Sequence, residues 1–305
     1  MGKATLLACD WGTTNLRAWT LDQDGRVVEH REFDLGVSRL APGEAAQRFE
    51  AEVQPAFGAQ GLPAILCGMV GSNLGWTVAP YADCPVGLEE LAACLAPVEA
   101  HGAWARIVPG VRSQGVAGAP DVMRGEETQL MGWLAEHPDR RLGRRVICHP
   151  GTHAKWMLVE DGRLVRFVTA MTGELFAVLG KHSVLKSDAP ADDREAFAAG
   201  LAAAGEGDAL AARLFTARAR VVGGGAPAES TPSYLSGLLI GAEVAAVPRL
   251  LGVRDDEPVV LLGDEKLCSL YSQALDRRGV AHETFDGEAA AVAGLFALYS
   301  LGAAR

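Results

Sequence analysis

The sequence predicts an α/β protein built from two lobes of related design, because one pattern of strands and turns occurs twice. Residues 5–28 and residues 145–165 each read as an apolar strand, a Gly-Thr turn, a second strand, an Asp-Gly-Arg turn and a third strand. Helical patterns follow both copies. Two copies of one supersecondary unit, about half a chain apart, indicate two similar lobes.

In the first lobe, apolar runs bounded by glycine and aspartate predict short strands, and longer amphipathic runs predict helices. In chain order we expect strands over 5–10, 15–21 and 26–33, a helix over 43–57, a strand over 64–68, a long loop over 68–85, a helix near 88–95 and a strand near 105–108. Residues 111–120 (VRSQGVAGAP) are rich in glycine and small residues and predict a hinge. Asp121 follows as the expected N-cap of a helix over 122–135.

The second lobe repeats the three strands and then continues mainly as helices. The expected helices cover 173–180, 188–204, 208–220, 234–246, 264–277 and 288–301, and a buried strand covers 258–262. We therefore predict an N-terminal lobe over 1–119, completed by a C-terminal helix at 288–305, and a C-terminal lobe over 120–287.

The composition is that of a globular protein with room for two cores. The 305 residues are 49% hydrophobic and 22% charged, with a net charge of −10 and no run of lysine or arginine. Nucleic acid and anionic membranes are therefore not expected as partners. The six cysteines form no C-x-x-C pair, and no segment approaches the length of an apolar membrane span. We expect a cytoplasmic protein in a reducing compartment, and a homodimer is left open.

The Gly-Thr turns are candidate phosphate sites. Glycine permits a tight turn and a close approach of the backbone, and threonine adds a hydroxyl beside free N–H groups. The candidates are Gly12, Thr13 and Thr14 in the first copy and Gly151 and Thr152 in the second. Two such turns on two similar lobes can hold the phosphates of one nucleotide from both sides.

Carboxylates beside these turns are the candidate catalytic groups. Asp10 ends the first strand and is suited to hold Mg²⁺ through water, although it also fits a turn aspartate that caps its own loop. Asp121 is the candidate general base, with an ordinary N-cap as the alternative. Its neighbours Arg124, Glu126 and Glu127 either serve the site or form a solvated helical face.

Two further segments have weaker signals. Gly263 and Asp264 end a buried strand and begin a helix, which is compatible with an adenosine pocket but common in α/β proteins. The loop over 68–85 is long for a compact lobe, so we interpret it as a wall of the substrate site. Its candidate substrate residues are Ser72, Asn73 and Trp76.

Together these motifs resemble the superfamily of sugar kinases, heat-shock-70 proteins and actin. Residues 10–14 (DWGTT) look like its first phosphate motif, Gly151-Thr152 like its second, and residues 259–264 like its adenosine motif. Asp121 before a predicted helix is similar to the segment of the hexokinase branch that supplies the catalytic base. The resemblance implies two ribonuclease-H-like (actin-like ATPase) lobes around a nucleotide cleft.

Longer stretches resemble the 2-dehydro-3-deoxygalactonokinase family. They are GMVGSNLGW (68–76), DVMRGEETQLMG (121–132), HPGTHAKW (149–156) and TAMTGELFAVLGKHSVL (169–185). This resemblance implies ATP- and Mg²⁺-dependent phosphorylation of the 6-hydroxyl of 2-dehydro-3-deoxy-D-galactonate. It also places Thr172 and Glu174 where hexokinase relatives carry a sugar-contacting segment. Asn73 stands where this family is often basic, so the group that meets the substrate carboxylate is left open.

Two rival functions remain at this stage. One is a kinase of another sugar acid or small acid on the same fold. The other is a non-catalytic module that senses ATP or sugar. A DNA-binding regulator should add a basic helix-turn-helix domain, and none fits before Thr5 or after Leu301. The candidate base and the phosphate turns favour a kinase.

Overall fold

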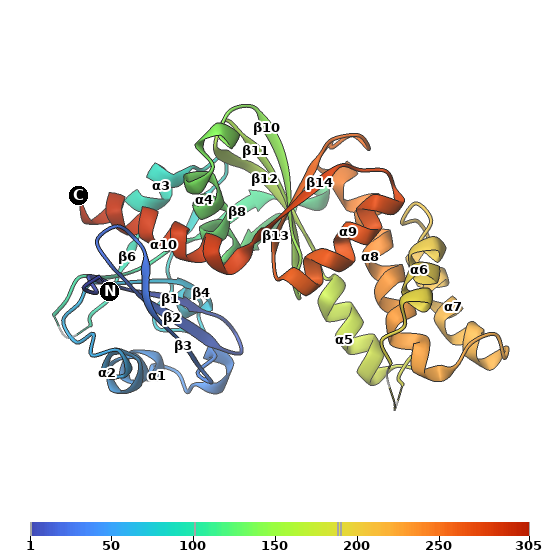
Figure 1. The fold of residues 1–305 in the computed structure, drawn as a ribbon, viewed down its shortest axis with the longest axis horizontal. Coiled ribbons are helices and arrows are strands. Elements are labelled where there is room, and N and C mark those ends of the chain that lie inside the picture. Colours follow the sequence, from blue (N-terminus) through green and yellow to red (C-terminus); the bar gives the residue numbers. More distant parts are fainter. Residues whose placement is uncertain (1, 101, 188, 190, 305) are drawn as a thin grey trace.

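The structure is a computed structural model that describes residues 2–100, 102–187, 189 and 191–304 (Figure 1). Residues 1, 188 and 305, which begin or end predicted elements, lie outside the described residues. The prediction of two α/β lobes of duplicated design is confirmed by the order of strands in two large sheets.

The sheet of the N-terminal lobe has six strands in the order β3-β2-β1-β4-β7-β6. Its strands are β1 (Leu6–Trp11), β2 (Leu16–Leu21), β3 (Val27–Phe33), β4 (Ala64–Gly68), β6 (Ala96–Pro97) and β7 (Ala105–Ile107). The apolar strands β1 and β4 are parallel neighbours in the middle, where both faces are covered. The polar strand β3 (VVEHREF) lies at the edge, where its charged side chains reach water.

The sheet of the C-terminal lobe has the order β12-β11-β10-β13-β14. Its strands are β10 (Arg144–His149), β11 (Ala154–Glu160), β12 (Arg163–Ala170), β13 (Val259–Gly263) and β14 (His282–Asp286). In both lobes the first strand pairs antiparallel with the second and parallel with the fourth, so the repeat seen in the sequence is a repeat of topology.

Helices pack against both sheets (Figure 1). In the first lobe, α1 (Glu44–Arg48), a π-helical turn (Phe49–Val53) and α2 (Gln54–Ala56) form the segment predicted as one helix, and α3 spans Leu88–Ala93. In the second lobe, the helices are α5 (Thr172–His182), α6 (Arg194–Ala203), α7 (Leu210–Val222), α8 (Thr231–Leu250) and α9 (Glu265–Arg277). The long helix α8 packs against α6, α7 and α9.

A small third sheet corrects the predicted hinge. Its order is β5-β8-β9, with β5 (Tyr81–Asp83), β8 (Gly110–Gln114) and β9 (Pro120–Met123). Residues 111–120 thus lie in a hairpin, because β8 and β9 pair antiparallel from Val111–Met123 to Gln114–Pro120. A glycine-rich composition predicted a hinge, but the polar backbone of this segment is paired within a sheet.

The predicted helix over 122–135 begins later, as α4 (Glu126–Glu136). Asp121 lies inside β9 opposite Ser113, so its prediction as a helix N-cap is wrong. Gly125, with φ 107°, makes the turn between strand and helix, a backbone conformation that disfavours other residues.

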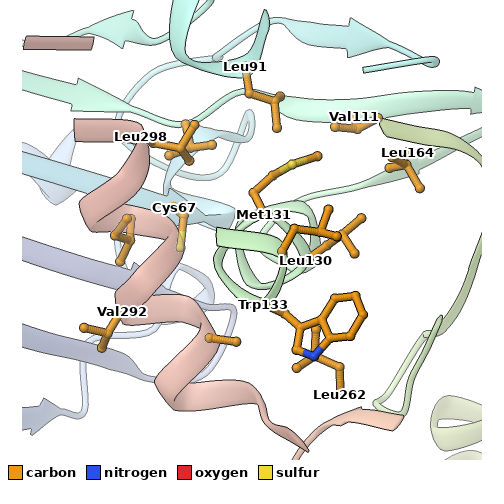
Figure 2. Close-up of a cluster of buried hydrophobic side chains, with 14 of the residues drawn as sticks. Cys67, Leu91, Val111, Leu130, Met131, Trp133, Leu164, Leu262, Val292 and Leu298 are labelled. Carbon is orange, nitrogen blue, oxygen red and sulfur yellow. The ribbon is translucent and has the colours of Figure 1, made fainter. Parts of the chain in front are cut away.

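Helix α4 and the C-terminal helix α10 (Gly287–Ala303) cross each other next to both sheets. Figure 2 shows Leu130, Met131 and Trp133 of α4 among side chains from α10 and from strands of both lobes. α10 also contacts α3, β1 and β4, so the end of the chain packs on the first lobe. This packing supports the predicted completion of that lobe by the C-terminal helix, whose exact boundary stays a prediction.

Within the described ranges, no helix is both long and apolar enough to cross a membrane.

The α4–α10 crossing leaves no room for a side chain on Gly132. A methyl group there would lie 1.9 Å from the carbonyl oxygen of Ala290 and 2.4 Å from the nitrogen of Gly294. We therefore expect Gly132→Ala to lower the free energy of unfolding by about 3 kcal/mol, measured by urea denaturation.

The matched control is Gly180→Ala in α5, where a methyl group would meet no atom within 4 Å. It should leave stability unchanged or raise it by less than about 1 kcal/mol. Equal effects of the two substitutions would contradict the tight crossing.

Candidate active site

The first Gly-Thr turn joins β1 to β2 and is fixed through its carbonyl groups. The carbonyl oxygen of Thr14 accepts from the Gly36 N–H at 3.1 Å, and that of Thr13 accepts from the N–H and the hydroxyl of Ser38 at 3.1 and 2.7 Å. The side chains of both threonines are exposed. The turn is therefore held from behind while its hydroxyl groups remain open to a ligand.

The second Gly-Thr turn joins β10 to β11 and is held by the first turn of α5. The N–H of Glu174 donates to the carbonyl oxygen of Thr152 at 3.0 Å. The Glu174 carboxylate also contacts Nε2 of His153 at 2.5 Å. Gly151 faces open space, and Thr152 is exposed. Both turns thus have the same construction, a supported backbone and an open outer edge.

Asp10 lies beside the first turn and is paired with a cation. Its Oδ2 atom is 2.5 Å from Nη2 of Arg17, the residue opposite it on β2. Arg17 also approaches Glu288 of α10 at 3.5 Å. The guanidinium group holds the carboxylate at the position that the sequence assigned to metal binding.

The second lobe repeats this arrangement with different residues. His149 precedes the second turn, and the residue opposite it on β11 is Lys155. The His149 ring contacts Oε1 of Gln129 at 2.8 Å through Nε2, and burial lowers the pKa of its imidazole below the usual range. A neutral imidazole is therefore favoured at this position.

Lys155 connects the second lobe to the start of α4. It is only 4% exposed, and its Nζ atom lies 3.7 Å from Oε1 of Glu126. The other oxygen of Glu126, Oε2, is buried without a hydrogen-bond partner in the described part of the chain. The charges of Asp10, Glu126 and Lys155 all influence the pKa of His149, so the four groups lie close together. Glu126 thus presents an unpartnered carboxylate oxygen where the two lobes meet.

Glu127 points into the protein. It is fully buried, and its oxygens accept from the Gly125 N–H at 2.7 Å and from the Thr128 hydroxyl at 3.0 Å. Burial, and then the charge of Glu126, raise the pKa of this carboxyl to about 8. Glu127 is therefore mostly protonated at neutral pH.

Asp121, the predicted base, is held by the second lobe. Its two oxygens accept from the backbone N–H of Thr169 at 2.7 Å and from the Thr169 hydroxyl at 2.6 Å. Thr169 lies opposite Lys155 in the sheet, and Lys155 is the residue that approaches Glu126. Asp121 is therefore connected to Glu126 through this pair of strand residues. Both oxygens already have a partner, whereas Oε2 of Glu126 has none.

The long loop is folded over the core of the first lobe. The Ser72 hydroxyl donates to the carbonyl oxygen of Met69 and accepts from the Leu74 N–H, so it stabilises its own turn. Trp76 packs against Phe49, with ring centroids 5.3 Å apart. Asn73 is exposed at the surface of the loop. Substrate contacts of these residues stay predictions, and the geometry supports Asn73 better than Ser72 or Trp76.

Thr172, another predicted substrate residue, lies in a buried cluster instead of an open wall. Its side chain interacts with Glu243 of α8, which also accepts from Nε1 of Trp156 at 2.7 Å and from the Tyr271 hydroxyl at 2.8 Å. Burial raises the pKa of Glu243. This cluster connects α5, β11 and α9, the elements next to the second turn. Thr172 is therefore placed to support the site.

Gly263 and Asp264, the predicted adenosine residues, line a cavity of about 500 Å³ together with Pro150, His149 and Arg17. Asp264 caps α9 by accepting from the Leu267 N–H at 3.0 Å. The cavity opens at the carboxyl ends of β10, β13 and β14, the edge where α/β proteins bind ligands. The adenosine role itself stays a prediction.

Sequence reasoning missed Arg17 and Lys155. Each is a basic residue inside an otherwise apolar strand, LRAWTL and AKWMLV. A long cationic side chain in such a strand is seldom buried without a partner. A basic residue in an apolar strand occurs shortly after each Gly-Thr turn, and this repetition could have identified both residues as candidates for the site.

Two lobes with one strand order, each with a Gly-Thr turn beside a basic strand residue, define a phosphotransferase of the duplicated ribonuclease-H-like fold. The family model for 2-keto-3-deoxy-galactonokinase matches residues 10–298. The chain therefore belongs to the 2-keto-3-deoxy-galactonokinase family, and the predicted family and enzyme class are confirmed.

Individual relatives agree over almost the whole chain. The 2-dehydro-3-deoxygalactonokinase of Escherichia coli (strain K12) is 37% identical over 294 residues, 96% of each chain. A protein of Rhizobium meliloti (strain 1021), named "probable 2-dehydro-3-deoxygalactonokinase", is 37% identical over 298 residues, 95% of each chain. A crystal structure from Sinorhizobium meliloti, described with the same enzyme name, superimposes with a TM-score of 0.84 at 35% identity, covering 96% of this chain and 98% of that one.

The buried Glu127 should make stability depend on pH. Its raised pKa means that the folded state binds a proton more tightly than the unfolded state, whose value is 4.5. Stability should therefore fall as pH rises from about 5 toward 8, by roughly 1 kcal/mol per unit. Glu127→Gln keeps the shape without the ionisation, so its melting temperature should exceed that of the wild type increasingly up to about pH 8.

The measurement is thermal unfolding of both proteins from pH 5 to 9. If the difference in melting temperature between the two proteins were the same at every pH, Glu127 would not be protonated in the folded protein.

Proposed function

We propose that this protein transfers the γ-phosphoryl group of ATP to the 6-hydroxyl of 2-dehydro-3-deoxy-D-galactonate, in galactonate catabolism. The observation that supports this most strongly is that residues beside the two open Gly-Thr turns, Asp10 in the first lobe and His149 in the second, lie close to Glu126. Oε2 of Glu126 has no hydrogen-bond partner among the described residues. Family membership supports the substrate, because relatives of the same length carry that enzyme name. The six free cysteines support the predicted reducing, cytoplasmic location.

The two turns would hold the phosphates of ATP from opposite lobes. Thr13, Thr14 and Thr152 offer hydroxyl groups, and Lys155 and Arg17 offer positive charge close to the turns. Cations and oriented donors that face the transferring group stabilise its charge in the transition state. These residues therefore bind and orient the phosphates.

The residues present also fit Mg²⁺. Asp10 supplies carboxylate oxygens beside the first turn, and Mg²⁺ prefers oxygen ligands with retained water. Asp10 would hold the ion through water once Arg17 shares or releases the carboxylate. When bound, the ion supplies neutralisation of the phosphate charge.

Glu126 is the better candidate for general base. A base needs a carboxylate oxygen within reach of the attacking hydroxyl, and Oε2 of Glu126 has no hydrogen-bond partner among the described residues. The ammonium group of Lys155 lies 3.7 Å from Oε1 and helps to hold the Glu126 side chain in place. Asp121 remains the alternative that the sequence predicted, and Thr169 already binds both of its oxygens.

Paired substitutions distinguish the two carboxylates. We expect Glu126→Gln to lower kcat by on the order of 10²-fold or more, because an amide cannot accept the hydroxyl proton. The KM for ATP should change little. Asp121→Asn should keep kcat within about tenfold, since the amide oxygen still accepts from the Thr169 N–H. The reverse pattern, measured by steady-state kinetics, would identify Asp121 as the base.

The substrate assignment is tested by coupled ADP release over a panel of acceptors. A 2-keto-3-deoxy hexonate should be phosphorylated with a kcat/KM at least about 10²-fold above that of glucose or galactose, because a charged group of the acid adds binding energy that a neutral sugar lacks. Comparable values for a neutral hexose would refute the sugar-acid assignment.

A further inference from the structure

Arg124 is a half-buried cation whose charge is not matched by a carboxylate. It lies between β9 and α4, and its guanidinium carbon is 4.2 Å from the ring centroid of Tyr81. Nη2 donates to the carbonyl oxygen of Ala79 at 2.5 Å. Nε and Nη1 are buried without a partner, and in the part of the chain that the structure describes no acidic group forms an ion pair with this arginine.

The surrounding chain is shaped to hold this side chain. A methyl group on Gly110 would lie 2.7 Å from Cγ of Arg124, and one on Gly71 would lie 3.1 Å from Nη1. Glycine at both positions therefore leaves a slot for the arginine between β8 and the loop that follows β4. The cation is held in place by its packing, while two of its nitrogens remain unused.

Such an arrangement is costly unless an anion completes it. A buried charged group loses hydration, and its unpaired N–H donors lose hydrogen bonds. A carboxylate restores both, because guanidinium–carboxylate bonds are charge-assisted and geometrically specific. An arginine that served only to brace the loop would gain stability from an acidic partner within the chain.

We infer that Arg124 binds the carboxylate of the sugar-acid substrate, an inference that rests on the proposed function. Glu126 is two residues further along the chain, so the carboxylate anchor and the proposed base belong to one short segment that also begins α4. The acid group and the reacting hydroxyl would then be fixed from the same rigid element. Arg124 thereby determines specificity for a 2-keto acid over a neutral sugar.

The test compares two acceptors in the full-length enzyme. One is the 2-keto-3-deoxy hexonate, and the other is the 3-deoxyhexulose of the same configuration, in which a hydroxymethyl group replaces the carboxylate. We expect Arg124→Met to lower kcat/KM for the acid by ten- to a hundredfold or more, as lost charged hydrogen bonds do. For the hexulose it should change less than about threefold. The ratio of kcat/KM for the acid to kcat/KM for the hexulose does not depend on the fraction of enzyme that is folded.

Arg124→Lys covers the case in which Arg124→Met does not fold. It keeps the charge but lacks the planar donors, and it should also reduce the ratio of acid to hexulose. The matched control is Arg112→Met on β8, an exposed arginine paired with Asp83 at 2.7 Å, which should leave the ratio unchanged.

The outcomes separate the two proposals. Equal losses for acid and hexulose would show that Arg124 only supports the fold, and no loss for either acceptor would place the binding site of the acid's carboxylate elsewhere. Either result overturns the assignment of Arg124 and leaves the kinase proposal intact. A wild-type enzyme that phosphorylates no 2-keto-3-deoxy acid would instead overturn the proposed function, and this inference with it.

Discussion

The close crossing of α4 and α10 is the constraint on which the rest of the structure depends. At Gly132 and Gly294 the two helices approach until backbone meets backbone, and a methyl group on either glycine would overlap the other helix. Core side chains from both sheets pack around this crossing. The first turn of α4 carries Glu126, and the first turn of α10 carries Glu288, which faces Arg17. The spacing of the helices therefore fixes the spacing of the charged groups between the lobes.

Much of this fold could be predicted because the signals were local. The two hairpins with their Gly-Thr turns read directly as strands, and Asp264 was recognised as the start of α9. The hairpin of β8 and β9 could not be recognised, because it is stabilised by pairing with β5 and by its own turn at residues 115–119, and its small residues resemble a hinge. The error at Asp121 follows from this, since a strand residue was interpreted as a helix cap.

The candidate site was predictable in its turns and less so in its charges. Asp10 and the threonines follow from their position at the end of a strand. The roles of Lys155 and Arg124 depend on partners far away in the sequence, and that of Glu127 depends on its burial, which no spacing reveals.

The matched hairpins also place equivalent residues beside the two Gly-Thr turns. Arg17 and Lys155 occupy equivalent positions on the second strand of each lobe, opposite Asp10 and His149. A linear polyphosphate is not symmetric, because one end bears the nucleoside and the other end reacts. The cations alone would accept it in either direction. The residues opposite these cations differ in charge, a carboxylate in the first lobe and an imidazole with a lowered pKa in the second. The duplicated scaffold is therefore electrostatically asymmetric at this pair of positions.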